Sequence, residues 1–549
     1  MKRLLILLLF PVAAYAQTLP DSITKKVDEI FKSFGPKTPG CSIAILKDGN
    51  VIFQKGYGMA NLEYDIPIVP TTIFHIASES KQYVAFCMLL LEKEGKISLD
   101  DDIRKHLDFV PDFGHKITIR HLIHHTSGLR DQWQLLANAG WQLDDVITQD
   151  HVIRLISKQK TLNFIPGDQF MYCNTGYTLM AEIVRKVSGM SLRQFTDKNI
   201  FLPLEMKDTH FHDDYLELVP GRAYSYSRHP RGFQHAVLSY SIVGATSLFT
   251  TVVDELKWLK NFESGKVGGK DLIEKMYEVG VLNDGRKLNY AFAIAIDSRN
   301  GSKQIGHGGA DAGYRTFAVR FPEHNLGIAV FSNLGSTNPT DLALRTADLM
   351  LPSDKAKPDA AATNTGTMVD SIKLKKLPGK YYSEDGIPAT LVWENGKLMS
   401  RGGNQRNEWK LYEEKPNRYS LPQNKQTLVI DKVGDSVTEM TIIAPSSTTK
   451  FKRLPLKPQE INVSFAGRFY NSETEAYYTV ALNKGNLVLQ HRKFGEVAMQ
   501  NVAPDQFTTP HWWMNHIRFI RNKAGNIIAF EVNSGRVLHL QFDRVTASQ

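Results

Sequence analysis

The sequence predicts an α+β domain, in which helices flank an antiparallel sheet, followed by two small antiparallel β-barrel domains. Three observations lead to this prediction. Strand patterns occur near both ends of the first 350 residues with helical patterns between them, the composition changes around residues 352–370, and the residues beyond repeat themselves. The chain of 549 residues is 42% hydrophobic and 22% charged, a globular composition with room for several domains that excludes wholesale disorder.

The first sixteen residues have the pattern of a secretory signal peptide. Lys2 and Arg3 precede an apolar run over residues 4–10, and Ala14-Tyr15-Ala16 forms a small-x-small cleavage pattern before Gln17. The apolar run is shorter than the ~20 residues that a membrane span needs. We therefore expect a signal peptide over residues 1–16, a periplasmic or secreted protein, and no transmembrane anchor.

Residues 17–352 have the pattern of one α+β domain. Apolar residues at helical spacing predict helices over 20–36, in the stretch after Ser78, and over 175–188. Short β-rich runs predict strands over 41–46, 51–56, 290–296, 314–321 and 326–333. Because strands lie at both ends of the domain, one sheet is expected to contain both ends of its chain.

The residues beyond 352 lose the helical patterns. A stretch without periodicity predicts a linker over 353–372, and alternating runs with Gly or Asn turns predict two lipocalin-like β-barrels, over 373–456 and 457–549. Three pairs of similar segments indicate a duplication at offsets of 88, 89 and 91 positions: Leu377–Tyr382 with Phe465–Tyr470, Glu394–Leu398 with Asn483–Leu487, and Phe451–Leu454 with Phe542–Val545.

Ser78-Glu79-Ser80-Lys81 is a Ser-x-x-Lys pattern at the start of a predicted helix. Residues three apart share a helix face, so the Lys81 amine can reach the Ser78 hydroxyl and remove the proton that makes serine a poor nucleophile. A helix N-terminus also favours a developing oxyanion. The pattern alone is weak, because Ser157-Lys158-Gln159-Lys160 matches it without supporting context.

Further blocks of sequence strengthen the Ser-x-x-Lys pattern. In chain order the blocks are Phe74–Lys81, Ile117–Leu129, Pro166–Tyr177, Pro203–Thr209 and Gly306–Arg315. With these blocks, residues 20–350 resemble the class C β-lactamase-like serine hydrolases, which include serine D-Ala-D-Ala carboxypeptidases, D-aminopeptidases and related esterases. The resemblance implies a catalytic domain like that of β-lactamases and penicillin-binding proteins.

The resemblance also implies roles for the matching residues. Ser78 would be the acylated nucleophile and Lys81 its proton partner. Tyr172 would share the general acid/base work, since a neighbouring ammonium favours the phenolate, and Asn174 would orient the substrate. The backbone N–H groups of Ser78 and Ala310 would form the oxyanion hole. The implied reaction is a two-step acyl transfer that needs no metal and no cofactor.

The segment His307-Gly308-Gly309 departs from the Lys-Thr-Gly that β-lactamases and carboxypeptidases usually carry. Histidine is mostly neutral at pH 7, so a fixed positive charge that helps hold substrate carboxylates is missing. We therefore expect inefficient β-lactam hydrolysis, and the resemblance implies that His307, Gly309 and Ala310 bind substrate. Arg315 either restores a carboxylate partner or is a solvated strand arginine.

Several other side chains have more than one interpretation. His121, His124 and His125 have no further ligand at useful spacing, so no metal site is expected from them. His75 and Trp133 either line the cleft or belong to the core.

The sequence therefore predicts a secreted serine hydrolase that cleaves an amide, such as a small peptide containing D-residues, through an acyl-serine intermediate. A carboxylesterase remains an alternative, because the same machinery attacks esters, and so does an inactive protein that binds cell-wall polymer. The net charge of +9 arises within residues 371–549, so an anionic wall polymer would meet this tail. A basic surface without any partner explains the charge equally well. No nucleic-acid partner is expected.

Overall fold

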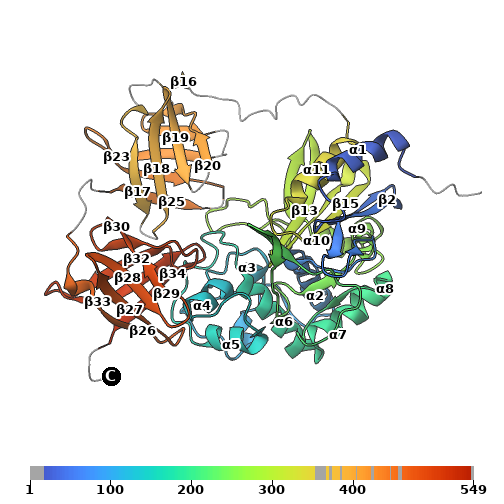
Figure 1. The fold of residues 1–549 in the computed structure, drawn as a ribbon, viewed down its shortest axis with the longest axis horizontal. Helices are drawn as coiled ribbons and strands as arrows, with labels where there is room; N and C mark the ends of the chain where they lie inside the picture. Colours follow the sequence, from blue (N-terminus) through green and yellow to red (C-terminus); the bar gives the residue numbers. More distant parts are fainter. Residues whose placement is uncertain are drawn as a thin grey trace, which may run out of the picture.

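The computed structural model describes residues 18–352, 367–369, 374–383, 386–402, 405–421, 426–445, 447–454 and 460–545. The expected signal peptide and most of the expected linker lie outside these residues. Among the described helices, none is long and apolar enough to span a membrane. We refer to residues 18–352 as the N-terminal domain, 367–454 as the first β-domain and 460–545 as the second β-domain (Figure 1).

Helices make up much of the middle of the N-terminal domain, and the predicted helices correspond to α1, α2 and α6. The helices are α1 (Asp21–Phe31), α2 (Ser80–Lys93), α3 (Ile119–Ile123), α4 (Gln132–Asn138), α5 (Gln149–Ser157), α6 (Asn174–Ser188), α7 (Leu192–Thr196), α8 (Leu202–Leu204), α9 (Val252–Ser264), α10 (Lys270–Lys275) and α11 (Pro339–Asp348). Three single turns are 3-10 helix: η1 (Ala77–Glu79), η2 (Ile103–Lys105) and η4 (Pro322–His324). A fourth, η3 (Asp197–Phe201), is π-helix.

The main sheet of the N-terminal domain is six-stranded and antiparallel, in the order β12-β13-β14-β15-β1-β2. Its strands are β1 (Cys41–Lys47), β2 (Asn50–Tyr57), β12 (Ala295–Arg299), β13 (Ser302–Asp311), β14 (Tyr314–Phe321) and β15 (Leu326–Ser332). Shorter strands are β3 (Met59–Asn61), β4 (Ile66–Pro67), β5 (Phe74–His75), β6 (Ile147–Thr148), β7 (His210–Phe211), β8 (Tyr226–His229), β9 (Gly232–His235), β10 (Tyr240–Ser241) and β11 (Leu248–Thr250). Because β1 pairs with β15, both ends of the domain's chain meet in one sheet, as predicted.

Helices cover both faces of the six-stranded sheet. Side chains alternate along a strand, so Ile43 of β1 packs in one cluster with Val27 of α1 and Ala343 of α11. Ala44 faces the opposite side and packs in the cluster that contains Trp258 of α9. The α+β class with an antiparallel sheet flanked by helices is therefore confirmed.

The strand predicted over residues 290–296 is largely wrong. Ala293 has a φ of +56°, and the Ala291 N–H donates to the Ile294 carbonyl, so these residues form a tight turn. The strand begins only at Ala295. The sequence prediction also omitted β13, whose glycines made it resemble a loop.

The two β-domains have the same strand order. The first β-domain contains β16 (Thr367–Met368), β17 (Gly379–Ser383), β18 (Pro388–Glu394), β19 (Lys397–Gly402), β20 (Gln405–Glu408), β21 (Tyr412–Lys415), β22 (Arg418–Leu421), β23 (Gln426–Val433), β24 (Val437–Ile443) and β25 (Thr448–Arg453). The second contains η6 (Val463–Phe465), β26 (Gly467–Asn471), β27 (Ala476–Asn483), β28 (Asn486–His491), β29 (Gly495–Ala498), β30 (Gln500–Ala503), β31 (Gln506–Thr508), β32 (His516–Arg521), β33 (Ile527–Ser534) and β34 (Val537–Arg544).

Equivalent strands support the duplication seen in the sequence. The order β21-β22-β23-β24-β25-β17-β18-β19-β20 of the first β-domain corresponds strand by strand to β30-β31-β32-β33-β34-β26-β27-β28-β29 of the second. Arg453 of β25 lies over the Tyr381 ring at 5.8 Å, and Arg544 of β34 lies over the Phe469 ring at the same distance. Both sheets curl in the manner of a barrel, as predicted (Figure 1).

Candidate active site

The Ser-x-x-Lys segment lies where a short strand turns into a helix. Strand β5 ends at His75, Ala77 adopts a φ of +50°, and Ser78 follows in η1, immediately before α2. A left-handed conformation at a residue with a side chain is a strained arrangement of the kind that functional turns often contain. It places the half-buried Ser78 at the N-terminal end of a helix, as the sequence predicts.

Lys81 is fully buried and donates three hydrogen bonds. Its Nζ lies 3.0 Å from Ser78 Oγ, 2.9 Å from Asn174 Oδ1 and 2.6 Å from the Ala245 carbonyl oxygen. Burial lowers the pKa of Lys81 to about 7, because an ammonium loses hydration in the interior, although nearby carboxylates partly oppose the change. The amine therefore changes protonation state close to neutral pH.

Asp131, which the sequence prediction did not include, holds Asn174 in place. One carboxylate oxygen of Asp131 accepts both the backbone N–H and the side-chain amide of Asn174, at 2.8 and 2.7 Å. Since the amide nitrogen donates to Asp131, the amide oxygen is left to accept from Lys81. Asp131 also caps α4 by accepting the Trp133 N–H. The pair Asp131 and Asn174 thus orients the lysine toward the serine.

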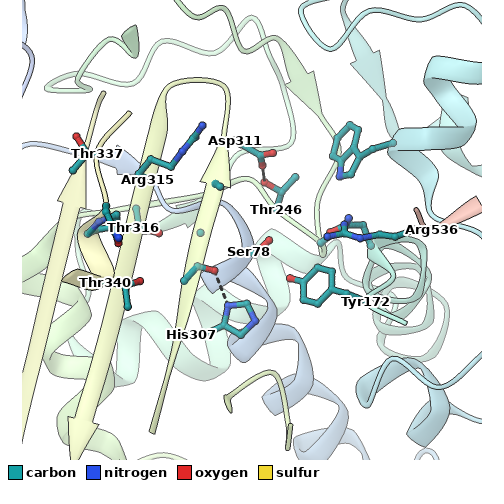
Figure 2. A pocket seen from close by; sticks show the side chains of 18 residues that line it. Ser78, Tyr172, Thr246, His307, Asp311, Arg315, Thr316, Thr337, Thr340 and Arg536 are labelled. Carbon is teal, nitrogen blue, oxygen red and sulfur yellow. Dashed lines mark hydrogen bonds between the residues drawn. The ribbon is translucent and has the colours of Figure 1, made fainter. Parts of the chain in front are cut away.

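The Tyr172 hydroxyl points toward Ser78, and both residues line the cavity (Figure 2). Its hydroxyl is buried and forms no hydrogen bond within the described part of the chain. Burial raises the pKa of Tyr172, and the proximity of Ser78 and Arg536 offsets only part of this effect. The phenolate expected from the sequence is therefore disfavoured, and Tyr172 is a neutral phenol whose proton is available.

His307 is neutral and held by hydrogen bonds to both of its ring nitrogens. Burial lowers its pKa to about 4. Nδ1 lies 2.7 Å from the Gly308 carbonyl oxygen, so it carries the proton, and Nε2 then accepts from the Tyr290 hydroxyl at 3.1 Å. Tyr290 in turn lies 3.2 Å from His125 Nε2, whose other ring nitrogen accepts the Cys173 N–H. This position on β13 therefore supplies no fixed cation.

The edge of the six-stranded sheet approaches the Ser78 turn at Gly309. A Cβ added to Gly309 would lie 2.1 Å from the Ile76 carbonyl oxygen, so any side chain would push β13 away. The Thr316 hydroxyl of β14 donates to the same carbonyl at 3.0 Å and secures the approach. Ala310, the next residue, lines the cavity with Ser78, so the arrangement brings together the two residues of the expected oxyanion hole.

These groups surround a cavity of about 520 Å³ with a charged rim (Figure 2). Arg315 lies on one side, where its guanidinium donates to the carbonyl oxygens of Ala312 and Tyr314. Arg536, from the hairpin between β33 and β34 of the second β-domain, lies on the other side, 4.8 Å above the Tyr172 ring. Asp311 also lines the cavity, and burial raises its pKa to about 6.

The residues predicted from the sequence come together in this region. Those that line the cavity are Ser78, Tyr172, Asn174, His307, Gly309, Ala310 and Arg315, and Lys81 is bonded to Ser78. Of the two residues left open, Trp133 lines the cavity and His75 is buried in the core. Sequence reasoning missed Asp131, Tyr290, Asp311 and Arg536. Asp131 and Asp311 lie beside or within quoted blocks, whereas nothing in the sequence marked Arg536.

Comparison with known proteins identifies the family of the N-terminal domain. Residues 27–350 match the family described as Beta-lactamase. Penicillin-binding protein 4* of Bacillus subtilis is 27% identical over 394 residues, which are 68% of this chain and 86% of that protein. A D-aminopeptidase of Brucella anthropi is 27% identical over 343 residues, 61% of this chain and 64% of its own length. The octameric penicillin-binding protein homologue from Pyrococcus abyssi matches with a TM-score of 0.54 and 25% identity, over 78% of this chain and 99% of its own.

Proposed function

The chain belongs to the β-lactamase family of serine hydrolases, and from that premise we propose that it is an exported amidase or peptidase that is acylated on Ser78. One observation carries the proposal. The buried Lys81 amine, with its pKa lowered to about 7, lies 3.0 Å from the Ser78 hydroxyl. A substantial fraction of such an amine is neutral at pH 7, so it can accept the serine proton during attack.

In the proposed acylation step, Ser78 Oγ attacks the substrate carbonyl carbon while its proton moves to Lys81 Nζ. Tyr172, kept neutral by the raised pKa of its hydroxyl, gives its proton to the leaving nitrogen. The Lys81 ammonium then returns a proton to Tyr172, whose ring lies 5.0 Å from Nζ. Water releases the acyl group when the same residues act in the opposite direction.

The oxyanion that develops on the carbonyl would be bound by the backbone N–H groups of Ser78 and Ala310. Donors fixed in advance at such a position contribute about 2.7–4 kcal/mol each to transition-state stabilisation. The contact between Gly309 and Ile76 supports this assignment, because it fixes β13 against the Ser78 turn. A residue with a side chain at position 309 would separate the two donors.

The charges around the cavity favour a peptide over a simple ester. Asp311, ionised above about pH 6, can meet a substrate ammonium, while Arg536 and Arg315 can meet a carboxylate. A substrate with both charges is an amino-acid amide or short peptide. The relative named D-aminopeptidase supports a D-residue on the acyl side. Since neutral His307 replaces a fixed cation on β13, β-lactams should be poor substrates.

A substrate screen with a covalent probe tests the proposal. D- and L-aminoacyl p-nitroanilides and p-nitrophenyl esters are compared with nitrocefin, and the chain is labelled with a fluorophosphonate. We expect D-aminoacyl amides to be turned over, and both labelling and activity to be lost in Ser78→Ala, by at least about 10³-fold in kcat. Turnover of esters alone would identify a carboxylesterase. A folded wild-type chain that no fluorophosphonate labels would contradict any enzymatic function.

Export can be tested separately from activity. The signal peptide proposed over residues 1–16 should be removed in a bacterial host with a functional secretion pathway, so that the mature chain begins at Gln17. N-terminal sequencing of protein from the periplasm or medium measures this directly. Full-length protein retained in the cytoplasm would contradict export and leave the acyl-serine proposal unaffected.

A further inference from the structure

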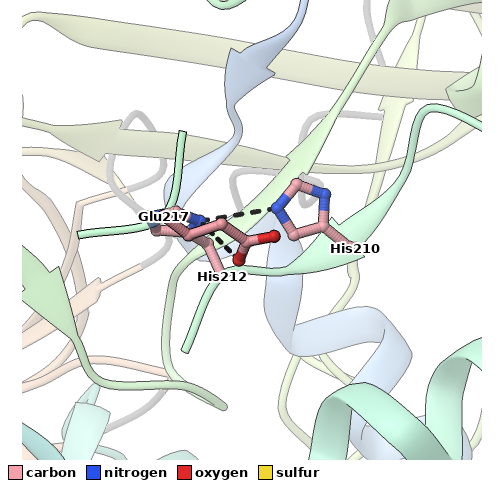
Figure 3. A group of neighbouring side chains, drawn as sticks. All are labelled: His210, His212 and Glu217. Carbon is pink, nitrogen blue, oxygen red and sulfur yellow. Dashed lines mark hydrogen bonds and ion pairs between the residues drawn. The ribbon is translucent and has the colours of Figure 1, made fainter. Parts of the chain in front are cut away.

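A second group of polar side chains lies in the N-terminal domain, apart from the cavity that contains Ser78. Its members are His210 on strand β7, His212 just after that strand, and Glu217 in the turn that follows (Figure 3). Within the described ranges, it is the single set of three histidine, cysteine or acidic residues whose ligand atoms all lie within 4.8 Å of one another. The histidines considered in the sequence for metal binding are not part of it.

Three potential ligand atoms converge here without bonding strongly to one another. His210 Nε2 lies 3.5 Å from His212 Nδ1, at the outer limit of a hydrogen bond, and His212 Nδ1 lies 3.7 Å from Glu217 Oε2, beyond that limit. Zinc bonded tetrahedrally at 2.0–2.1 Å holds neighbouring ligand atoms about 3.3 Å apart. The two separations are slightly longer than this value, and all three ligand atoms lie within 4.8 Å of one another, so a small adjustment would let them share one metal ion.

The surroundings fix each side chain in this arrangement. The His210 ring stacks on Phe249 with an angle of 13° between the ring planes, and the His212 ring meets Phe249 edge-on at 4.8 Å. The Arg193 guanidinium of α7 donates to both carboxylate oxygens of Glu217, at 2.5 and 2.9 Å. Such outer partners commonly hold metal-binding carboxylates in position. Asp213 also bonds to Arg193, which adds negative charge beside the group.

One side of the group is open to ligand. His210 and Glu217 line a cavity of about 500 Å³ together with Arg193 and Pro220. His212, by contrast, is buried against the strand, and its backbone N–H donates to the Ser247 carbonyl. Three protein ligands on one side and a cavity on the other leave room for a water molecule or small ligand as the fourth ligand.

We propose that His210, His212 and Glu217 bind one divalent transition-metal ion of zinc-like chemistry. Imidazole and carboxylate are the ligands that zinc accepts in such sites. The ion would join β7 to the turn at Glu217. Since β7 pairs with β11 and β11 pairs with β5, it would also brace the small sheet whose last strand leads into Ser78. Bound there, the ion would stabilise this sheet and keep one position open to water or a small ligand, apart from the cavity that contains Ser78.

Metal content and metal affinity of the full chain test this site. The protein, freed of any affinity tag and treated with a chelator, is titrated with Zn²⁺ in competition with a chromophoric chelator. We expect one Zn²⁺ per chain, a rise in the thermal unfolding temperature on addition of Zn²⁺, and the intense visible absorption of tetrahedral Co²⁺ when cobalt replaces zinc. No binding, or binding without any of the Co²⁺ absorption, would overturn the proposal.

Matched variants assign the site to these residues. His210→Gln and Glu217→Gln should each weaken Zn²⁺ binding by at least about 10–100-fold, while His115→Gln, which removes an exposed histidine elsewhere, should bind as the wild type does. Both ligand positions are partly exposed, so these variants should fold. Wild-type affinity in both ligand variants would place the ion elsewhere and refute the assignment. Activity is not the readout, so a failure here says nothing about Ser78.

Discussion

The two β-domains share a strand order but join the N-terminal domain in different ways. Buried side chains of the second β-domain, such as Phe469 and Trp513, belong to the same packed cluster as the core of the N-terminal domain. The first β-domain has a separate cluster around Tyr381 and Trp409. In each, the hairpin before the last strand contacts the N-terminal domain. The turn between β24 and β25 accepts hydrogen bonds from Arg286, whereas the turn between β33 and β34 carries Arg536 into the cleft.

The two β-domains therefore share a fold but have different roles. One hairpin supplies backbone carbonyl oxygens to an arginine of the N-terminal domain, and the equivalent hairpin supplies an arginine to the active site. The β33–β34 hairpin also forms more hydrogen bonds to the N-terminal domain. The Asp131 backbone N–H and the Asn163 side-chain amide donate to the Arg536 carbonyl oxygen, and the Arg536 backbone N–H donates to the Gln134 side-chain oxygen. The difference indicates that the second β-domain contributes to the candidate active site, whereas the first only contacts the N-terminal domain.

The largest effect is expected where the second β-domain is anchored. Arg130 is fully buried and donates to Glu473 at 2.7 Å and to the carbonyl oxygens of Leu538 and His539. Arg130→Ala leaves the Glu473 carboxylate buried without its cation, which costs about 3–5 kcal/mol. We expect a lower thermal unfolding temperature, release of the second β-domain by limited proteolysis, and loss of activity.

If Arg130→Ala kept the thermal unfolding temperature and the activity of the wild type, the second β-domain would not be anchored through Arg130. Arg130→Lys serves as the matched control, because it keeps the charge but loses the forked geometry of the guanidinium. It should give an intermediate result.

A smaller effect is expected for the arginine that reaches the cleft. The Arg536 side chain is 44% exposed and lies 3.8 Å from the buried Asp131 carboxylate. Asp131 keeps its hydrogen bonds from Asn174 and Trp133 without Arg536, so Arg536→Ala should cost only about 1 kcal/mol of stability. The positive charge of Arg536 helps to lower the pKa of Lys81. Without it the Lys81 pKa rises, more of the amine is protonated at a given pH, and the acidic limb of the kcat/KM profile moves to higher pH. Substrates with a free carboxylate should also lose about tenfold in kcat/KM, a change of about 1.4 kcal/mol.

The pH profile separates this role from a merely structural one. Arg536→Lys retains the charge and should keep the acidic limb close to its wild-type position. The displacement seen in Arg536→Ala should shrink at high ionic strength, because salt screens an exposed charge. An unchanged acidic limb in Arg536→Ala would show that the second β-domain does not influence Lys81.

Features set by local sequence pattern could be predicted from the sequence, whereas contacts between residues far apart in the chain could not. Ser78 and Lys81 are neighbours on one helical turn, so their contact follows from spacing alone. The repeated segments fall on equivalent strands of the two β-domains. They preserve the same local packing, in which a glycine of the first long strand lies against an arginine of the last strand: Gly379 against Arg453, and Gly467 against Arg544. The turn at Ala293 was missed, since alternating apolar residues do not reveal a positive φ.

Arg536 could not have been predicted, for a different physical reason. Its place in the cleft depends on the docking of the second β-domain through Arg130 and Gln134, and no local periodicity encodes that contact. The net charge drew attention to the tail as a surface for a polymer, while one of its arginines points into the active site (Figure 2). Asp131 lies two residues after the Ile117–Leu129 block, so its position near the site could have been inferred from the sequence.

The smallest effect is expected at the anchor of the first β-domain. Arg286 donates to the carbonyl oxygens of Ala444 and Ser447, at 2.7 and 3.2 Å, and pairs with the exposed Asp284. The Arg286 side chain is 25% exposed and its contacts are to neutral carbonyl oxygens and an exposed aspartate, so no buried charge is left without a partner and Arg286→Ala should cost about 1 kcal/mol. We expect kcat/KM and the acidic limb of the pH profile to stay within about twofold of the wild type, measured beside Arg130→Ala under the same conditions. If Arg286→Ala lost as much activity as Arg130→Ala, both β-domains would shape the cleft. That result would contradict the different roles inferred for them.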